Sequence, residues 1–278
     1  MIELYNKLSN RCSRITTNLY STSFSLGVTC LDRRFQAPIC AIYGFVRLAD
    51  EIVDTFHGFD QTVLLERFET DTYRAIDERI SLNPILQSFQ LTVNSSKIEK
   101  DLIAEFLRSM EMDLSKKEYD TTEIKNYIGG SAEAVGLMCL KVFCEGNDKL
   151  FEDLSYSARK LGSAFQKVNF LRDLKSDYLD LGRNYFPSIR LDHWNVSSKQ
   201  DVEKSIEQDF DEALTGIKAL PRSSRLGVFA SYVYYRSLFN KIKRVSPEVI
   251  LHRRVRVANA HKARLLAYSF LKHQLNLI

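Results

Sequence analysis

The chain is short of residues that interrupt regular structure. Its 278 residues include only five prolines and eleven glycines. Folds built from many short strands need frequent turn residues, so this scarcity favours long helices. The periodicity of apolar residues predicts helices at 10–28, 36–56, 62–80, 98–116, 121–145, 149–181, 200–217, 222–244 and 256–275. The one clearly irregular stretch runs from about 182 to 198.

Cysteine, histidine and long apolar runs are also sparse, and each absence excludes a class of protein. The five cysteines include no Cys-x-x-Cys pair, and no two of the five histidines have zinc-ligand spacing. The N-terminus shows no signal-peptide pattern, and no run of about 18 apolar residues predicts a membrane span. We therefore expect a protein of the reducing cytoplasm.

The general composition is that of one soluble domain. Apolar residues make up 45% of the chain and charged residues 27%, and no repeat, linker or low-complexity tract divides it. We predict a single all-α domain over residues 1–278, with helices packed around a central cavity. The space between packed helices is where such folds place their ligands.

Basic residues are concentrated near the C-terminus. The net charge is only +4, but the segment 241–264 has eight Lys/Arg and a single acid, Glu248. This segment is either a solvated helix face or a surface for phosphate groups or an anionic membrane. No nucleic-acid partner is expected. Peripheral contact with the inner face of the membrane and the oligomeric state stay open.

Two carboxylates share a face of a predicted apolar helix. Asp50 and Asp54 are four residues apart, so they lie one turn from each other and repel. Their neighbours are largely apolar, and a buried unpaired carboxylate costs several kcal/mol. A cation must offset the pair, either the side chain of Arg47 or a bound Mg²⁺.

A second polar stripe recurs further along the chain. Asn169, Asp173 and Asp177 follow at four-residue steps, and Gln166 extends the stripe by three. Arg172 lies beside it, as Arg47 lies beside the first pair. Either stripe alone is most simply a salt-bridged helix face. Together, two helices of this kind could hold several Mg²⁺ between them, with the oxygens of a diphosphate completing the coordination.

These residues resemble the squalene/phytoene synthase family from about residue 18 to residue 190. The resemblance rests on five ordered segments. They are Ser21-Thr-Ser23-Phe24, Tyr43-x-x-x-Arg47-x-x-Asp50-x-x-x-Asp54, Tyr127-Ile-Gly-Gly-Ser-Ala132 through Val135-Gly136, Leu161-Gly162-x-Ala164-x-Gln166-x-x-Asn169-x-x-Arg172-Asp173-x-x-x-Asp177, and Gly182-Arg183-Asn-Tyr185-Phe-Pro187.

The resemblance implies an isoprenoid synthase fold and a set of site residues. The metal ligands, for Mg²⁺ or alternatively Mn²⁺, would be Asp50, Asp54, Asn169, Asp173 and Asp177. The catalytic residues would be Tyr43, Arg47, Tyr127 and Arg172. The substrate-binding residues would be Ser21, Ser23, Phe24, Arg47, Tyr127, Phe165, Gln166, Asn169, Arg172 and Tyr185.

The implied reaction is the Mg²⁺-dependent head-to-head (1–1′) joining of two prenyl diphosphates through a cyclopropyl diphosphate. Our first expectation is phytoene from two geranylgeranyl diphosphates in carotenoid biosynthesis, without NADPH. The alternative is a farnesyl diphosphate enzyme that makes dehydrosqualene, squalene or presqualene diphosphate. A terpene cyclase or head-to-tail elongase is disfavoured because the chain has no Asp-Asp-x-x-Asp motif. A non-catalytic helical isoprenoid-binding protein is the remaining hypothesis.

Overall fold

A computed structural model describes residues 1–179, 181–186 and 194–278, and within these ranges the chain contains helices and no strand. The helices are α1 (Ile2–Tyr20), α2 (Thr22–Thr29), α3 (Arg33–Asp54), α4 (Gln61–Glu78), α5 (Pro84–Ser96), α6 (Lys100–Ser115), α7 (Thr121–Ile128), α8 (Val135–Cys144), α9 (Asp148–Leu179), α10 (Val196–Ala219), α11 (Arg222–Lys243), α12 (Pro247–His252) and α13 (Asn259–Gln274). A π-helical stretch, η1 (Gly129–Ala134), joins α7 to α8. The predicted all-α class is confirmed.

Helix caps explain where the elements differ from prediction. The expected helix at 10–28 is wrong as one element, because Ser21 adopts extended backbone and its side chain accepts a hydrogen bond from the backbone N–H of Phe24. That cap ends α1 and begins α2. Two helices were missed, α5 and the short α12. Asn83 caps α5 and Pro84 occupies its first turn, so the pair marks a helix start.

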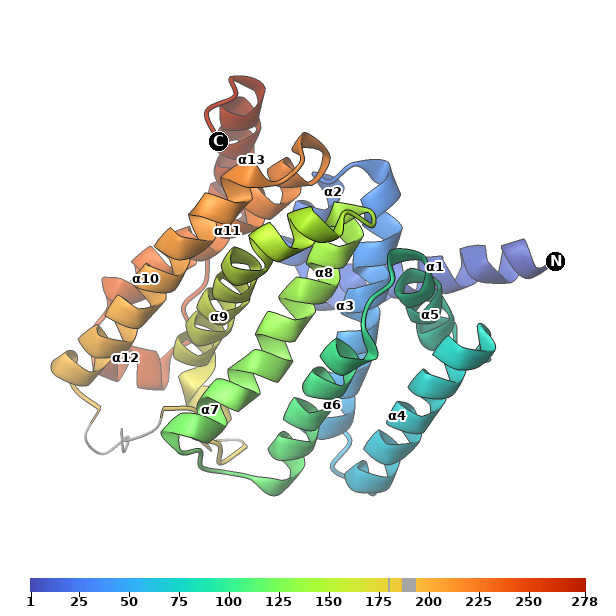
Figure 1. The fold of residues 1–278 in the computed structure, drawn as a ribbon. Coiled ribbons are helices and arrows are strands. Elements are labelled where there is room, and N and C mark those ends of the chain that lie inside the picture. Colours follow the sequence, from blue (N-terminus) through green and yellow to red (C-terminus); the bar gives the residue numbers. More distant parts are fainter. Residues whose placement is uncertain (180, 187–193) are drawn as a thin grey trace.

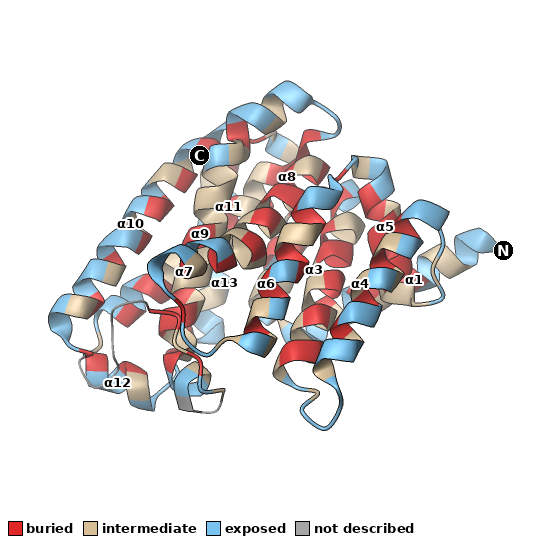
Figure 2. Cartoon of the chain, turned by 60° about the horizontal axis from the view of Figure 1, so that its bottom comes forward, coloured by how far each residue is buried: buried red, intermediate tan, exposed pale blue. Residues whose placement is uncertain are grey.

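The helices form two packed groups (Figure 1). In one, α3 contacts α1, α4, α5 and α6, while in the other α9 contacts α10, α11 and α12. Each group has its own apolar cluster, one centred on Phe45, Phe89 and Phe106 and the other on Phe210, Phe239 and Leu171. Buried residues line the inner faces and exposed residues the outer faces (Figure 2). Of the irregular stretch expected at 182–198, residues 187–193 lie outside the described ranges.

The run α7–η1–α8 lies between the two groups. It packs on α6 and α3 on one side and on α9 on the other. Its span, Thr121–Cys144, is long and apolar enough to cross a membrane by length and composition. However, 61% of the apolar window is buried inside the bundle, which is the pattern of a core helix. We expected no membrane span. One helix passes the test of length and composition, and it lies in the core of the bundle.

Candidate active site

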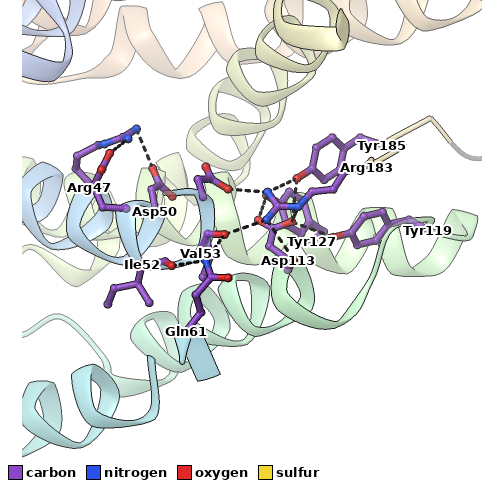
Figure 3. A network of polar contacts seen from close by, with 12 residues as sticks. Arg47, Asp50, Ile52, Val53, Gln61, Asp113, Tyr119, Tyr127, Arg183 and Tyr185 are labelled. Atoms are coloured by element: carbon purple, nitrogen blue, oxygen red, sulfur yellow. Dashed lines mark hydrogen bonds and ion pairs between the residues drawn. The ribbon is translucent and has the colours of Figure 1, made fainter. Parts of the chain in front are cut away.

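Helix α3 presents the first aspartate pair, Asp50 and Asp54, at its C-terminal end. Asp32 caps the start of the helix by accepting a hydrogen bond from the backbone N–H of Arg34. At the other end, the side chain of Gln61 donates to the carbonyls of Ile52 and Val53 at 2.7 and 3.0 Å (Figure 3). These bonds satisfy carbonyls that a helix end leaves free, and they hold the last turn that carries Asp54.

Helix α9 presents the second stripe, which consists of Gln166, Asn169, Asp173 and Asp177. Val168, Leu171 and Leu174 alternate with the stripe and are buried in the second apolar cluster. Because these apolar residues fix one face of α9 in the core, the polar stripe lies on another face of the helix. Its first two members, Gln166 and Asn169, line the cavity described below. The hydroxyl of Tyr235 donates to the Asn169 side-chain oxygen at 3.3 Å and orients that amide.

The carboxylates of the two helices lie within electrostatic range of each other. Burial, followed by repulsion from Asp54, raises the pKa of Asp50 to about 8. Burial, followed by repulsion from Asp173 and Asp54, raises the pKa of Asp177 to about 8. Since Asp54 on α3 affects the pKa of Asp177 on α9, the C-terminal ends of the two stripes lie near each other. Like charges gathered in this way favour a bound cation.

Four arginines surround these carboxylates. Arg172 binds Asp173 with its Nε at 3.0 Å and its Nη2 at 2.5 Å, and Arg254 reaches the same carboxylate at 2.7 Å. Arg183 binds Asp54 at 2.6 Å. Arg47 forms the expected ion pair with Asp50, at 3.9 Å, and a closer one with Glu51. It also lies over the ring of Tyr20, 4.4 Å from the centroid.

A buried carboxylate that sequence reasoning missed organises one side of the site. Asp113 on α6 accepts hydrogen bonds from the hydroxyls of Tyr119 at 3.0 Å, Tyr127 at 2.7 Å and Tyr185 at 2.8 Å (Figure 3). The Arg183 Nε lies 3.8 Å from the same carboxylate, and an Arg183 Nη2 donates to the Asp113 carbonyl at 3.2 Å. Burial raises the pKa of Asp113, while Arg183 and the tyrosine hydroxyls oppose that rise. Asp113 therefore connects α6, α7 and the segment after α9.

An apolar cavity of about 280 Å³ lies between the two helix groups, and its lining includes Tyr43 of α3 and Gln166 and Asn169 of α9. Its wall follows α9 from Asn169 back to Leu154, a span of about 22 Å at 1.5 Å per residue. Leu31, Phe143 and Leu220 line it together with Leu154. An apolar lining with a few polar side chains, Gln166 and Asn169 among them, suits an apolar chain with a polar head.

Five of the predicted substrate-binding and catalytic residues line this cavity. They are Phe24, Tyr43, Phe165, Gln166 and Asn169. The rings of Phe24 and Tyr43 stack with centroids 4.8 Å apart, and those of Phe165 and Tyr235 stack at 3.9 Å. Burial raises the pKa of Tyr43 to about 12, so its hydroxyl keeps its proton at neutral pH.

The other predicted contacts lie outside the cavity lining. Tyr127 and Tyr185 are buried with their hydroxyls on Asp113, Ser21 caps α2, and Ser23 lines a small separate pocket between α2, α11 and α13. Gly130 has a structural role: a Cβ there would lie 2.2 Å from the Glu105 carbonyl, so this glycine lets η1 pack closely on α6.

Three residues of the site were not predicted, and they differ in the signal that the sequence gives for them. Asp113 is an acid between the apolar residues Met112 and Leu114 near the end of α6. Arg183 belongs to the motif that begins at Gly182. Because 129 residues separate it from Asp54, the sequence does not indicate their contact. Arg254 is one of the eight basic residues in the segment 241–264, and nothing in the sequence distinguishes it from the others.

A sequence profile of the squalene/phytoene synthase family matches residues 17–261. The chain belongs to the squalene/phytoene synthase family. Among its relatives are phytoene synthase 1, chloroplastic, of Solanum lycopersicum (26% identical over 260 residues, 86% of this chain and 62% of that protein) and 4,4'-diapophytoene synthase of Staphylococcus haemolyticus (23% over 249 residues, 81% and 84%). The chain thus spans less than two thirds of the tomato protein.

Solved structures of this family have the same fold. A dehydrosqualene synthase in complex with a ligand superposes with a TM-score of 0.84 at 21% identity, covering 96% of this chain and 98% of that one. A squalene synthase from Alicyclobacillus acidocaldarius gives 0.75 at 19%, covering 87% and 95%. Membership of the squalene/phytoene synthase family and an all-α isoprenoid synthase fold are therefore established for this chain.

The aspartates of this family member have the chemistry that Mg²⁺ requires. Mg²⁺ takes hard oxygen ligands, usually one or two carboxylates completed by water and phosphate oxygens. Asp50 and Asp177 are held among like charges, and within the described ranges the Asp177 carboxylate forms no ion pair. No three acidic, histidine or cysteine side chains of the described residues are gathered to hold an ion alone. An ion bound here would need water and diphosphate oxygens as further ligands.

Proposed function

We propose that this chain joins two molecules of geranylgeranyl diphosphate head to head, giving phytoene and releasing diphosphate. The observation that carries the proposal is an apolar cavity whose lining includes Tyr43, Gln166 and Asn169, which belong to the two motifs that carry the aspartates. Family membership and relatives that are phytoene and diapophytoene synthases support head-to-head condensation. The length of the cavity wall along α9 supports the longer prenyl chain.

In this proposal a bound Mg²⁺ would supply positive charge to offset that of the departing diphosphate. Asp50 and Asp54 on α3, with Asn169, Asp173 and Asp177 on α9, would hold it. The arginines beside them, Arg47 and Arg172, would bind the diphosphate by charge-assisted hydrogen bonds. To do so each must exchange its present carboxylate partner for phosphate oxygens.

The apolar wall would govern the carbon chemistry. The C1–O bond of one substrate breaks, its allylic carbon adds to the C2–C3 double bond of the other, and loss of a proton closes a cyclopropane ring. A second ionisation and rearrangement give the 1–1′ bond, and loss of a proton leaves the central double bond of phytoene. The stacked pairs Phe24–Tyr43 and Phe165–Tyr235 would exclude water and stabilise cations by about 1–2 kcal/mol each.

The test is a product assay with Mg²⁺ and either geranylgeranyl or farnesyl diphosphate, with and without NADPH, followed by mass analysis of the extracted lipid. We expect a C40 hydrocarbon from geranylgeranyl diphosphate without NADPH. A C30 product from farnesyl diphosphate alone would replace the proposal with the dehydrosqualene or squalene alternative. Absence of any product from either substrate would favour a non-catalytic isoprenoid-binding protein.

A further inference from the structure

Helix α1 packs its small polar residues against the protein and exposes its large apolar residues to solvent. The residues it buries against α3 and α5 are small and polar: Ser9, Ser13 and Thr17. Ser13 packs against Gly44, because a Cβ on that glycine would lie 3.0 Å from the Ser13 hydroxyl. The Ser13 Oγ lies 2.5 Å from the Ser88 Oγ. Small residues let α1 approach its neighbours closely, so the inner face needs no large apolar side chains.

The large apolar side chains of α1 face solvent instead. Leu4, Leu8, Ile15 and Leu19 are 74%, 52%, 57% and 78% exposed. At 100° per residue they fall within about 60° of one another, roughly 150° from Ser13. They form one continuous stripe, which we call the outer stripe of α1. The N-terminal turns of this helix project from the edge of the bundle (Figure 1).

Positive charge borders the outer stripe on one flank. Lys7, Arg11 and Arg14 are all exposed and lie within about 60° of each other on the helix, next to the leucines. Glu3 is the one acid of the helix. An apolar stripe with a basic border is the pattern of a helix that lies in the plane of a membrane interface.

We propose that α1 docks this protein on a bilayer containing anionic lipid, with its outer stripe in the acyl boundary and its basic border on the lipid phosphates. A second copy of the chain fits the surface less well. The outer stripe and its basic border comprise seven residues, few against the roughly 20–30 residues a side of a standard protein interface. An antiparallel pair centred between Leu8 and Ile15 would also bring Arg11 against Arg11 of the other copy.

The position of α1 connects this surface with the cavity. Ser21 ends α1 and begins α2, whose residues Phe24, Gly27 and Val28 line the apolar cavity. If the proposed function holds, a water-insoluble product would form beside the helix that lies on lipid. Docking itself does not depend on that function, because the surface is formed without substrate.

Vesicle co-sedimentation without substrate tests the proposal. We expect binding to phosphatidylcholine vesicles containing 30% phosphatidylglycerol, weaker binding to phosphatidylcholine alone, and weakening of the anionic component by salt. Replacing Leu8, Ile15 and Leu19 together by Ser should reduce binding at least about tenfold. Replacing Lys7, Arg11 and Arg14 by Gln should reduce binding to anionic vesicles about fivefold for each charge.

A matched control separates α1 from other exposed apolar surface. Phe270 and Leu271 on α13 and Leu275 just after it are also about half exposed or more, and the triple Ser variant there should bind vesicles as the parent does. Circular dichroism and light scattering would verify that each variant is folded and give its oligomeric state. Binding unchanged in the α1 variant, or lost equally in both variants, would overturn the proposal. So would a lipid-free dimer that the α1 substitutions dissociate.

Discussion

Asp50 and Asp173 have different surroundings although both are expected to hold metal. Asp50 lies 3.9 Å from its nearest arginine and is destabilised by burial and by Asp54, which together raise its pKa to about 8. Asp173 has two close arginine partners, Arg172 and Arg254. The same substitution should therefore affect folding stability in opposite directions at the two positions.

Replacing Asp50 by Asn should stabilise the metal-free protein by about 0.5–2 kcal/mol, because it removes repulsion at a strained functional site. Replacing Asp173 by Asn should destabilise it, because Arg172 loses its partner. Both variants should lose turnover by orders of magnitude. Thermal unfolding without metal, together with product formation, measures the two effects. Near-normal turnover in either variant would contradict the metal-ligand assignment.

Asp113 provides a second test at this scale. Its replacement by Asn removes the charge that accepts three tyrosine hydroxyls and faces Arg183, so we expect a loss of about 3 kcal/mol in the free energy of unfolding. Replacing Tyr119 by Phe removes one hydrogen bond and should cost about 1 kcal/mol. Urea unfolding compares them. Equal losses in both variants would show that Asp113 does not organise the network.

At the scale of elements, the long helices were predictable and the buried polar helix α5 was not. Helices such as α4, α6 and α11 carry apolar residues at helical spacing, and their predicted ranges lie within a few residues of the observed ones. Helix α5 instead buries Gln87, Ser88 and Gln90, whose side chains bond to neighbouring segments. Because polar residues occupy buried positions, the sequence of α5 shows no separation into an apolar and a polar face. The contact between Asp54 and Arg183 was equally hidden, because only the packing of distant elements creates it.

The junction of η1 with α6 gives a prediction for two adjacent glycines. A Cβ at Gly130 would lie 2.2 Å from the Glu105 carbonyl, whereas a Cβ at Gly129 would meet nothing within 4 Å. Gly130→Ala should therefore destabilise the protein by about 1–3 kcal/mol through overpacking. Gly129→Ala should be neutral or stabilise it by up to about 1 kcal/mol. The difference between their melting temperatures is the measurement, and similar values would contradict close packing at Gly130.

At the scale of the whole molecule, the site is divided between the two helix groups. One group carries Asp50 and Asp54, and the other carries Asn169, Asp173 and Asp177. Neither group alone presents both sets of oxygens, so ligands that bridge them should stabilise their association. Sequence reasoning found both stripes and the arginines beside them, Arg47 and Arg172, because each motif is local. It missed Arg183 and Arg254 because they come from other segments.

This division predicts that Mg²⁺ and inorganic diphosphate act together on the melting temperature. Ligands that bind the folded state raise stability by mass action, by about 2.7 kcal/mol at one hundred times the dissociation constant. We expect the pair to raise the melting temperature by about 5 °C or more, well above the sum of the separate shifts. Differential scanning fluorimetry measures this. Additive or absent shifts would favour carboxylates that serve only as salt-bridged structure.

The link between Asp54 and Arg183 joins residues 129 positions apart, and it has a consequence for how the protein fails. Since each helix group has its own apolar cluster, partial loosening can separate the groups while most helices persist. Turnover would then vanish at milder denaturant than the far-ultraviolet helical signal. Turnover therefore requires both helix groups to be packed together, and its loss would report their separation before the helices unfold.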